Sequence, residues 1–127
     1  MTNQIKAHAP GSADLTDMKA VTDQAEITDT YALYLDDESH SFDGKAEKIL
    51  FPTTANQVAA ILREASENGT PVTIQGGRTG LTGGAVPLGG IILNLEKMTE
   101  LLYMGYSAED GLYSIAGQGG VLLEDLV

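Results

Sequence analysis

A glycine-rich segment, Thr73 to Pro87, constrains this chain more than any other part of its sequence. Its residues are TIQGGRTGLTGGAVP, and seven of the chain's 15 glycines lie between Gly76 and Gly90. Glycine loses more backbone freedom on folding than any other residue, so a run of glycines in an ordered segment carries an entropic penalty. We therefore expect an irregular loop whose backbone comes close to something that side chains would exclude.

A strand–helix–strand unit is predicted immediately before this loop. The apolar run 48–51 fits a short strand. Thr54 and Gln57 form a capping-box pattern, and the apolar residues that follow recur at the i, i+3, i+4 and i+7 spacing of a helix: Val58, Ile61, Leu62 and Ala65. Gly69 is typical of a helix end, and residues 72–75 then alternate as in a strand that leads into the loop.

Further strands are predicted after the loop. The continuous apolar run 91–95 fits a strand that is buried on both faces. Residues 100–106 and 111–117 flank the turn-like sequence SAEDG and predict a hairpin. The final residues, VLLEDLV, resemble the first turns of a helix with no C-cap signal, so we expect the chain to be part of a longer protein.

The predicted domain organisation has two parts. Residues 1–30 are polar and acidic, with only a sparse helical pattern, and are interpreted as an N-terminal extension. Residues 31–127 are interpreted as a partial domain of the α+β class, a small sheet with flanking helices.

Composition excludes several classes of function for these 127 residues. The net charge of −11 argues against nucleic acids and anionic membrane surfaces as partners, since both attract basic patches. The absence of cysteine excludes disulfides, thiolate metal sites and a catalytic thiol, and no metal site is predicted. No apolar leader follows Met1 and no apolar run approaches about 18 residues, so no membrane span and a cytoplasmic location are expected.

The glycine-rich segment also excludes acidic residues. The chain holds 18 aspartates and glutamates, yet none lies between Asn68 and Leu95, where Arg78 is the single charged residue. A glycine-rich turn after a strand presents several backbone N–H groups to one place, which suits an anion. Arg78 would add a charge-assisted contact, and Thr79 and Thr82 would add hydroxyl donors. The pattern favours a phosphate or pyrophosphate site, and the alternative is a tight glycine-rich crossover without a ligand.

Two familiar nucleotide-binding motifs do not match this loop. A Rossmann fingerprint needs a glycine two residues after the first, where this chain has Arg78, and a helix after the loop. A Walker A motif ends in Gly-Lys-Ser/Thr, but the only basic residue here is Arg78 in mid-loop.

A third pattern does match. The sequence FPTTANQVAAILREASENGTPVTIQGGRTGLTGGAVPLGGIILNLEKM resembles the first subdomain of the FAD-binding domain of vanillyl-alcohol oxidase-type flavoproteins, and most closely the glycolate and D-lactate dehydrogenase branch. The family loop is matched at Gly76, Gly77, Thr79, Gly80, Gly83, Gly84, Ala85 and Pro87. Family members often carry glycine where this chain has Arg78. The resemblance extends over about residues 31–127, including YLDDESHSF and AGQGGVLLEDL.

The resemblance implies a fold and a cofactor. Two α+β subdomains would pack around FAD, with the glycine-rich loop of the first subdomain on the pyrophosphate. The residues implied at the pyrophosphate are Gly76, Gly77, Arg78, Thr79, Gly80, Leu81, Thr82 and Gly83. Pro52 would lie near the adenine edge, and Gly117 would also approach the cofactor.

The resemblance also implies an activity for the full-length protein. It would oxidise a 2-hydroxy acid such as glycolate or D-lactate by hydride transfer to the flavin, and pass the electrons to a partner protein or quinone. The second FAD subdomain and the substrate-binding cap are expected downstream, so the catalytic residues stay unknown and the 127-residue chain alone is expected to be inactive. The alternative is a non-catalytic phosphate-binding, nucleotide-binding or interaction module. His40, beside several acidic residues, is interpreted as part of a solvated loop.

Overall fold

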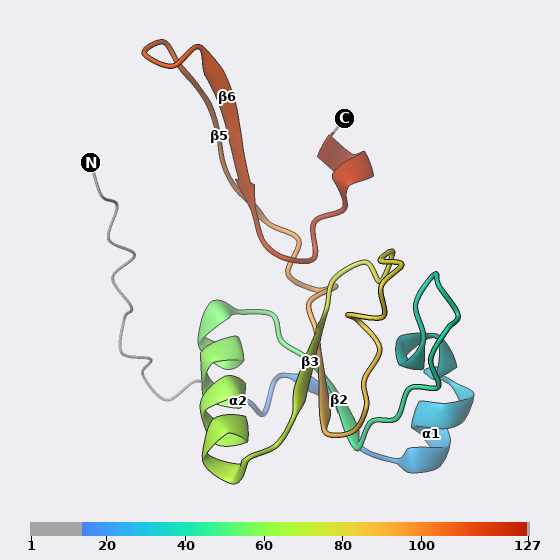
Figure 1. Ribbon diagram of the computed structural model, residues 1–127. Helices are drawn as coiled ribbons and strands as arrows, with labels where there is room; N and C mark the ends of the chain where they lie inside the picture. The colour runs from blue at the N-terminus through green and yellow to red at the C-terminus, as the bar shows by residue number, and fades with distance from the viewer. Residues whose placement is uncertain (1–13, 127) are drawn as a thin grey trace.

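The computed structural model describes residues 14–126, which form a four-stranded sheet, flanking helices and a separate hairpin (Figure 1). The sheet has the strand order β1 (Lys19–Val21), β2 (Lys48–Phe51), β4 (Ile91–Asn94), β3 (Val72–Gln75). Strands β2, β4 and β3 are parallel, and β1 is antiparallel to β2. The predicted strand–helix–strand unit and the buried strand after the loop are both confirmed.

Two apolar clusters cover the two faces of the sheet. Helix α2 (Ala55–Asn68) lies on one face, where Ile61 and Ala65 pack with Leu50 and Leu93. Helix α1 (Gln24–Asp29) and the 3-10 helix η1 (Ala32–Leu35) lie on the other face (Figure 1). Because successive side chains of a strand point to opposite faces, the uninterrupted apolar runs of β2 and β4 serve both clusters.

Helix α2 begins and ends where its sequence predicts. Thr54 Oγ1 accepts a hydrogen bond from the Gln57 N–H at 3.2 Å, and Gln57 Oε1 accepts one from the Thr53 N–H at 2.8 Å. The return bond of the capping box therefore goes to the residue before the N-cap. At the other end, Gly69 has φ 65°, the left-handed conformation that closes a helix with little steric penalty.

The N-terminal part of the described chain belongs to the fold. Strand β1 pairs with β2 and forms the edge of the sheet, and α1 packs against β2. Val21 is 3% exposed and Ile27 is 1% exposed, and both lie in the cluster around Phe51. The folded unit therefore starts before the boundary predicted at residue 31. The sequence offers little sign of this, because only two isolated apolar residues of a mostly polar segment are buried. Residues 1–13 of the predicted extension lie outside the described residues.

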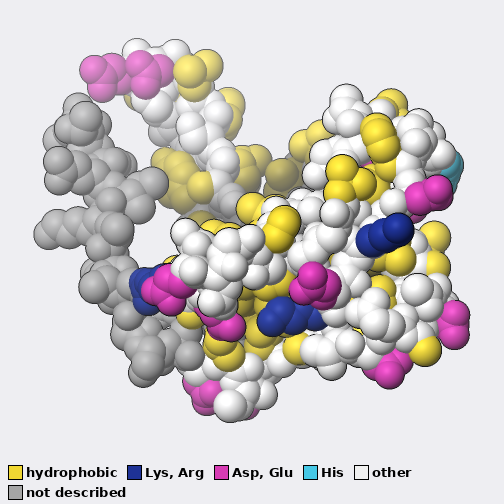
Figure 2. Space-filling view, turned by 60° about the horizontal axis from the view of Figure 1, so that its bottom comes forward, with side chains coloured by type: hydrophobic (Ala, Val, Ile, Leu, Met, Phe, Trp, Pro, Cys, Tyr) yellow, Lys and Arg dark blue, Asp and Glu magenta, His cyan; other side chains and the backbone are white. Residues whose placement is uncertain are grey.

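The predicted hairpin is confirmed and projects away from the sheet (Figure 1). Strands β5 (Leu101–Ser107) and β6 (Leu112–Gly117) pair antiparallel, and the rings of Tyr106 and Tyr113 lie 4.8 Å apart between centroids. Figure 2 shows exposed apolar side chains along the hairpin and acidic ones at its tip. A 3-10 helix, η2 (Leu123–Leu126), stands where a longer helix was predicted. Among residues 14–126 no helix is long and apolar enough to span a membrane.

Candidate FAD-binding loop

The glycine-rich loop leaves the carboxyl end of β3 and returns to the start of β4 (Figure 1). Ligands of open sheets with parallel strands bind outside the carboxyl ends of the strands. The loop is therefore placed where such a sheet offers a binding site.

The first half of this loop keeps its backbone donors free. From Gly76 to Thr82, no backbone N–H donates a hydrogen bond to any residue in the described part of the chain. The next N–H, that of Gly83, donates to Asp37 Oδ2 at 2.8 Å. Unpaired N–H groups that follow one another along the backbone are available to an anion, as in the nests that bind phosphate groups. We call residues 76–82 the open arm of the loop.

The structure requires glycine at some positions of the loop and not at others. Gly83 has φ 77°, and a Cβ there would lie 2.4 Å from the Phe42 ring, so only glycine fits. Gly80 and Gly84 have no positive φ, and a Cβ at either would meet nothing within 4 Å. The protein's own packing does not require glycine at these two positions. A ligand that approaches the backbone closely would require it.

A pocket of about 280 Å³ lies between the open arm and the segment after β6. Its lining is formed by Gly76, Gly77, Arg78, Glu96, Thr99, Gly120, Leu122 and Asp125. A Cβ at Gly76 would lie 3.0 Å from the Gly119 carbonyl oxygen, which shows how closely the two segments approach. The segment that follows the hairpin thus reaches the loop through Gly119 and Gly120. Gly117, the residue predicted to approach the cofactor, belongs to β6.

Carboxylates do lie near the loop in space. Glu96 and Asp125 line the pocket and Asp37 contacts Gly83, although the sequence around the loop is free of acidic residues. The exclusion of acids therefore holds along the chain but not around the folded loop. Sequence proximity could not reveal this, because the carboxylates of Asp37 and Asp125 come from distant segments.

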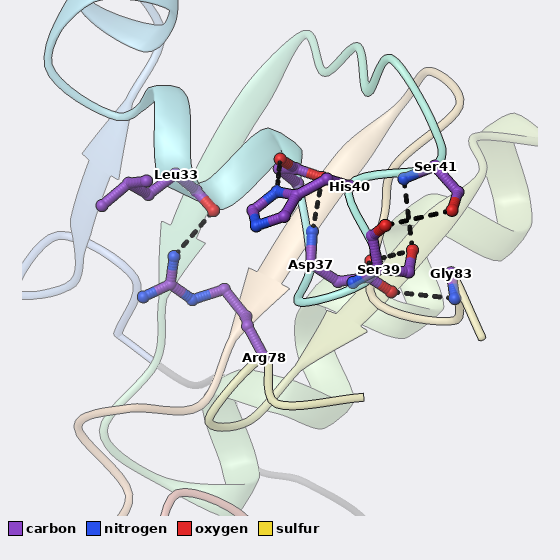
Figure 3. Close-up of polar contacts among 8 residues, drawn as sticks. Leu33, Asp37, Ser39, His40, Ser41, Arg78 and Gly83 are labelled. Carbon is purple, nitrogen blue, oxygen red and sulfur yellow. Dashed lines mark hydrogen bonds and ion pairs between the residues drawn. The ribbon is translucent and has the colours of Figure 1, made fainter. Parts of the chain in front are cut away.

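The side chain of Arg78 contacts η1, whereas the sequence predicted a contact with a bound anion. Its Nη1 donates to the Leu33 carbonyl oxygen at 2.8 Å (Figure 3). Its Cζ lies 4.0 Å from the centre of the Tyr34 ring. The guanidinium is thus engaged by η1, with Nε buried and unpaired among the described residues. The backbone of Arg78 has φ 59°, in the region that favours glycine. This conformation accounts for the glycine that resembling loops carry at this position.

A buried polar network supports the base of the loop, and the sequence analysis missed it. Gln75 Nε2 donates to the carbonyl oxygens of Tyr34 at 2.6 Å and Ala85 at 2.8 Å, and Asn94 Nδ2 donates to Gln75 Oε1 at 3.1 Å. Gln75 and Asn94 are both fully buried. The available signal was that each of the two neighbouring strands, β3 and β4, ends in an amide residue. An unpaired amide that is buried there would be costly.

Tyr34 connects this network to the pocket. Its hydroxyl donates to Glu96 Oε2 at 2.8 Å. Partial burial and this carboxylate raise the pKa of Tyr34 to about 12, with burial as the larger cause. The phenol therefore stays protonated at neutral pH and acts as a donor to Glu96.

Two further predicted positions are placed as follows. Pro52 is fully buried at the end of β2, so it offers no exposed surface to a cofactor. His40 lies on an exposed loop, with Nδ1 2.6 Å from Asp36 Oδ2 (Figure 3). The hydrogen bond to Asp36 raises the pKa of His40 and lowers that of Asp36. This pair is a surface ion pair in a solvated acidic loop.

Comparison with known proteins decides the family. A sequence model described as an FAD binding domain matches residues 46–127, which include β2, the glycine-rich loop and the hairpin. The chain belongs to this family. FAD is the cofactor that the family implies, and the open arm fits it: free N–H groups and uncrowded glycines are what a pyrophosphate needs.

The relatives are much longer sequences. A D-lactate dehydrogenase of Anaerostipes hadrus is 45% identical over 86 residues, covering 65% of this chain and 17% of the relative. A mitochondrial D-2-hydroxyglutarate dehydrogenase of Danio rerio is 34% identical over 117 residues, covering 89% of this chain and 21% of the relative. The chain thus spans about a fifth of these relatives or less.

Solved structures confirm the α+β fold class. The crystal structure of aclacinomycin oxidoreductase superposes with a TM-score of 0.61 at 15% identity, covering 86% of this chain and 21% of that one. At this identity the likeness concerns the fold alone.

Proposed function

We propose that this chain provides the pyrophosphate-binding loop of a FAD-dependent dehydrogenase that oxidises a 2-hydroxy acid. The observation that carries the proposal is the open arm, whose backbone N–H groups are free from Gly76 to Thr82 in a chain of the FAD-binding family. The backbone of these residues would hold the pyrophosphate, and the hydroxyls of Thr79 and Thr82 would add donors. Gly83, whose N–H is already bonded to Asp37, would contribute shape and no donor.

The chain's own contribution is binding and orientation. Bound FAD supplies the hydride acceptor for substrate oxidation. Arg78 belongs to the open arm, so its charge would add positive potential at a pyrophosphate bound there. Its contacts with Leu33 and Tyr34 hold the loop in place. Substrate-binding and catalytic residues are proposed to lie outside these 127 residues, since the relatives are about four times as long.

The proposed substrate class is a D-2-hydroxy acid. Two relatives are named for D-lactate and D-2-hydroxyglutarate, which share a hydroxyl on the carbon next to a carboxylate. Glycolate, the simplest 2-hydroxy acid, is achiral but carries the same hydroxyl next to a carboxylate. A partner protein or quinone is proposed as the electron acceptor, and a cytoplasmic location stays a prediction.

Anaerobic reduction of the flavin in the full-length protein tests this proposal. Purified protein should carry FAD, and D-lactate, glycolate or D-2-hydroxyglutarate should bleach its long-wavelength absorbance, with L-lactate as the comparison. A colourless protein that takes up no added FAD would refute the cofactor assignment. Retained FAD that none of these acids reduces would refute the substrate class.

A matched pair of variants tests the binding loop itself. Gly80→Asp places a carboxylate in the open arm, where the structure has free space, and should abolish FAD binding without unfolding the protein. Asn56→Asp adds the same charge on exposed α2 and should leave FAD affinity unchanged. Titrating the 127-residue chain with FAD, ADP and phosphate tests the alternative of a general phosphate-binding module. We expect weak FAD binding by this chain alone, so tight stoichiometric binding would contradict that expectation.

A further inference from the structure

We propose that Asp37 is a positioning residue that fixes one end of the loop, so that the open arm is already formed before the cofactor arrives. The inference rests on the proposed function, because it assigns Asp37 a role at the same FAD site. Asp37 lines a pocket of about 150 Å³ together with Gly77 and Arg78 of the open arm. Among the described residues, the loop N–H that it binds is that of Gly83, and it acts on the arm through this backbone group (Figure 3).

The Asp37 carboxylate is held in place by three donors. Its Oδ1 accepts hydrogen bonds from the Ser39 N–H at 2.9 Å and the Ser39 hydroxyl at 2.5 Å, and its Oδ2 accepts the Gly83 N–H at 2.8 Å. Asp37 is only 4% exposed. These bonds, that of the Ser39 hydroxyl first, lower the pKa of the carboxyl, so it is ionised at neutral pH. A nearly buried carboxylate with three donors is a rigid anchor.

Asp37 stands at the boundary between two halves of the loop. After Gly83 the loop is bonded at several points: the Val86 N–H donates to the Gly83 carbonyl oxygen, and the Gln75 amide donates to the Ala85 carbonyl oxygen. Further along, the Lys45 N–H donates to the Pro87 carbonyl oxygen at 2.8 Å. Before Gly83 no backbone N–H of the open arm is bonded to a described residue. The bond between Gly83 and Asp37 therefore marks the point at which the hydrogen-bonded half of the loop, residues 83–90, begins.

A rival role for the carboxylate is that of an internal anion that blocks the site. Two of its three hydrogen bonds come from Ser39, within its own turn, so the carboxylate stays in place when an anion binds to the open arm. It also engages only Gly83 and leaves the donors from Gly76 to Thr82 free. This arrangement favours positioning, and the two roles predict opposite changes in FAD affinity.

The test compares FAD dissociation constants of full-length variants. Asp37→Ala removes the anchor and should weaken FAD binding about tenfold, the scale of one hydrogen bond to a charged group. Asp37→Asn keeps an acceptor for Gly83 and should rescue affinity to within about threefold of the wild type. Asp43→Ala removes an exposed acid from the same segment and should change nothing. A blocking role would instead make Asp37→Ala bind FAD more tightly.

Hydrogen exchange of the FAD-free protein gives a second readout. In peptides covering residues 76–86, the amides of Gly83 and Val86, which are hydrogen-bonded in the wild type, should exchange faster in Asp37→Ala, while peptides from α2 stay unchanged. A lowered melting temperature with unchanged FAD affinity would overturn the proposal and leave Asp37 a structural role only. If Asp37→Ala does not fold, Ser39→Ala, which removes the hydroxyl donor to Asp37 Oδ1 and keeps the backbone donor, should weaken FAD binding about threefold, and unchanged affinity there would also overturn the proposal.

Failure of the two proposals can be told apart. Wild-type protein that binds no FAD refutes the proposed function, while the exchange rates of residues 76–86 still report whether Asp37 holds the loop. Wild-type protein that binds FAD together with an Asp37→Ala variant of equal affinity refutes the positioning role alone.

Discussion

The guanidinium of Arg78 stacks on the ring of Tyr34, with Arg78 Cζ 4.0 Å from the ring centre. Tyr34 also accepts a hydrogen bond from Gln75 through its carbonyl oxygen and donates its hydroxyl to Glu96. The short helical segment before the first parallel strand thus holds the glycine-rich loop at its start, as Asp37 holds it further along. The shape of the open arm depends on this upstream segment.

Replacing Arg78 tests that relationship. Arg78→Ala should lower the free energy of unfolding by about 1–2 kcal/mol, because it removes the stack on Tyr34 and the bond to Leu33. Arg78→Gly loses the same contacts but relieves the left-handed backbone, so it should be more stable than Arg78→Ala by up to about 1 kcal/mol. Denaturant unfolding of both variants measures the difference. An alanine variant at least as stable as the glycine variant would contradict the strained backbone.

Two glycines of the loop should respond to alanine in different ways. Gly83→Ala should lower the free energy of unfolding by about 2 kcal/mol or more, because φ is 77° and Cβ would meet the Phe42 ring. Gly80→Ala should change stability by less than about 0.5 kcal/mol yet weaken FAD binding, because its Cβ enters only the open arm.

Phe42→Ala provides the control for Gly83. Combined with Gly83→Ala it should recover part of the lost stability, since the aromatic clash is gone and only the backbone strain is left. Denaturation curves for stability and a FAD titration for binding separate the two glycines. Equal loss of stability at both positions would count against the division of the loop into two halves.

Gln75 should be sensitive to both shape and charge. Gln75→Leu leaves the carbonyl oxygens of Tyr34 and Ala85 without their donor and should lower the free energy of unfolding by about 2–4 kcal/mol. Gln75→Glu should be worse at neutral pH, because a carboxylate would face two carbonyl oxygens, and should recover as acid protonates it into a donor. Unfolding measured at several pH values tests this, and a pH-independent Gln75→Glu variant would argue against the network.

The ion pair of His40 and Asp36 predicts a small pH dependence. Asp36 raises the pKa of His40 above its ordinary value of 6.5, so the folded protein holds this proton more tightly than the unfolded chain. The stabilisation is complete below pH 6.5 and is lost as the pH rises through the raised pKa. The difference in unfolding free energy between wild type and Asp36→Asn should shrink over that range. A difference that grows with pH would have the wrong sign for this pair.

The sequence alone determined the elements that depend on local patterns. The apolar spacing of α2, its Thr54 and Gly69 caps, and the apolar runs of β2 and β4 all involve residues within a few positions of one another. The loop glycines also predicted an anion-binding backbone, because the resemblance and the missing acids are both visible along the chain. These signals placed the loop between two strands before any tertiary contact was known.

Only the tertiary structure decided how the loop is held. Arg78 meets Leu33 across 45 positions of sequence, Gly83 meets Asp37 across 46, and Gln75 meets Tyr34 across 41. Such partners leave no periodicity or spacing in the sequence, because the sheet brings their segments together only when it forms. For the same reason the edge strand at Val21 was not predicted, since the residues around it are polar. Arg78 is the single charged residue of the loop, and its side chain is hydrogen-bonded to the protein itself.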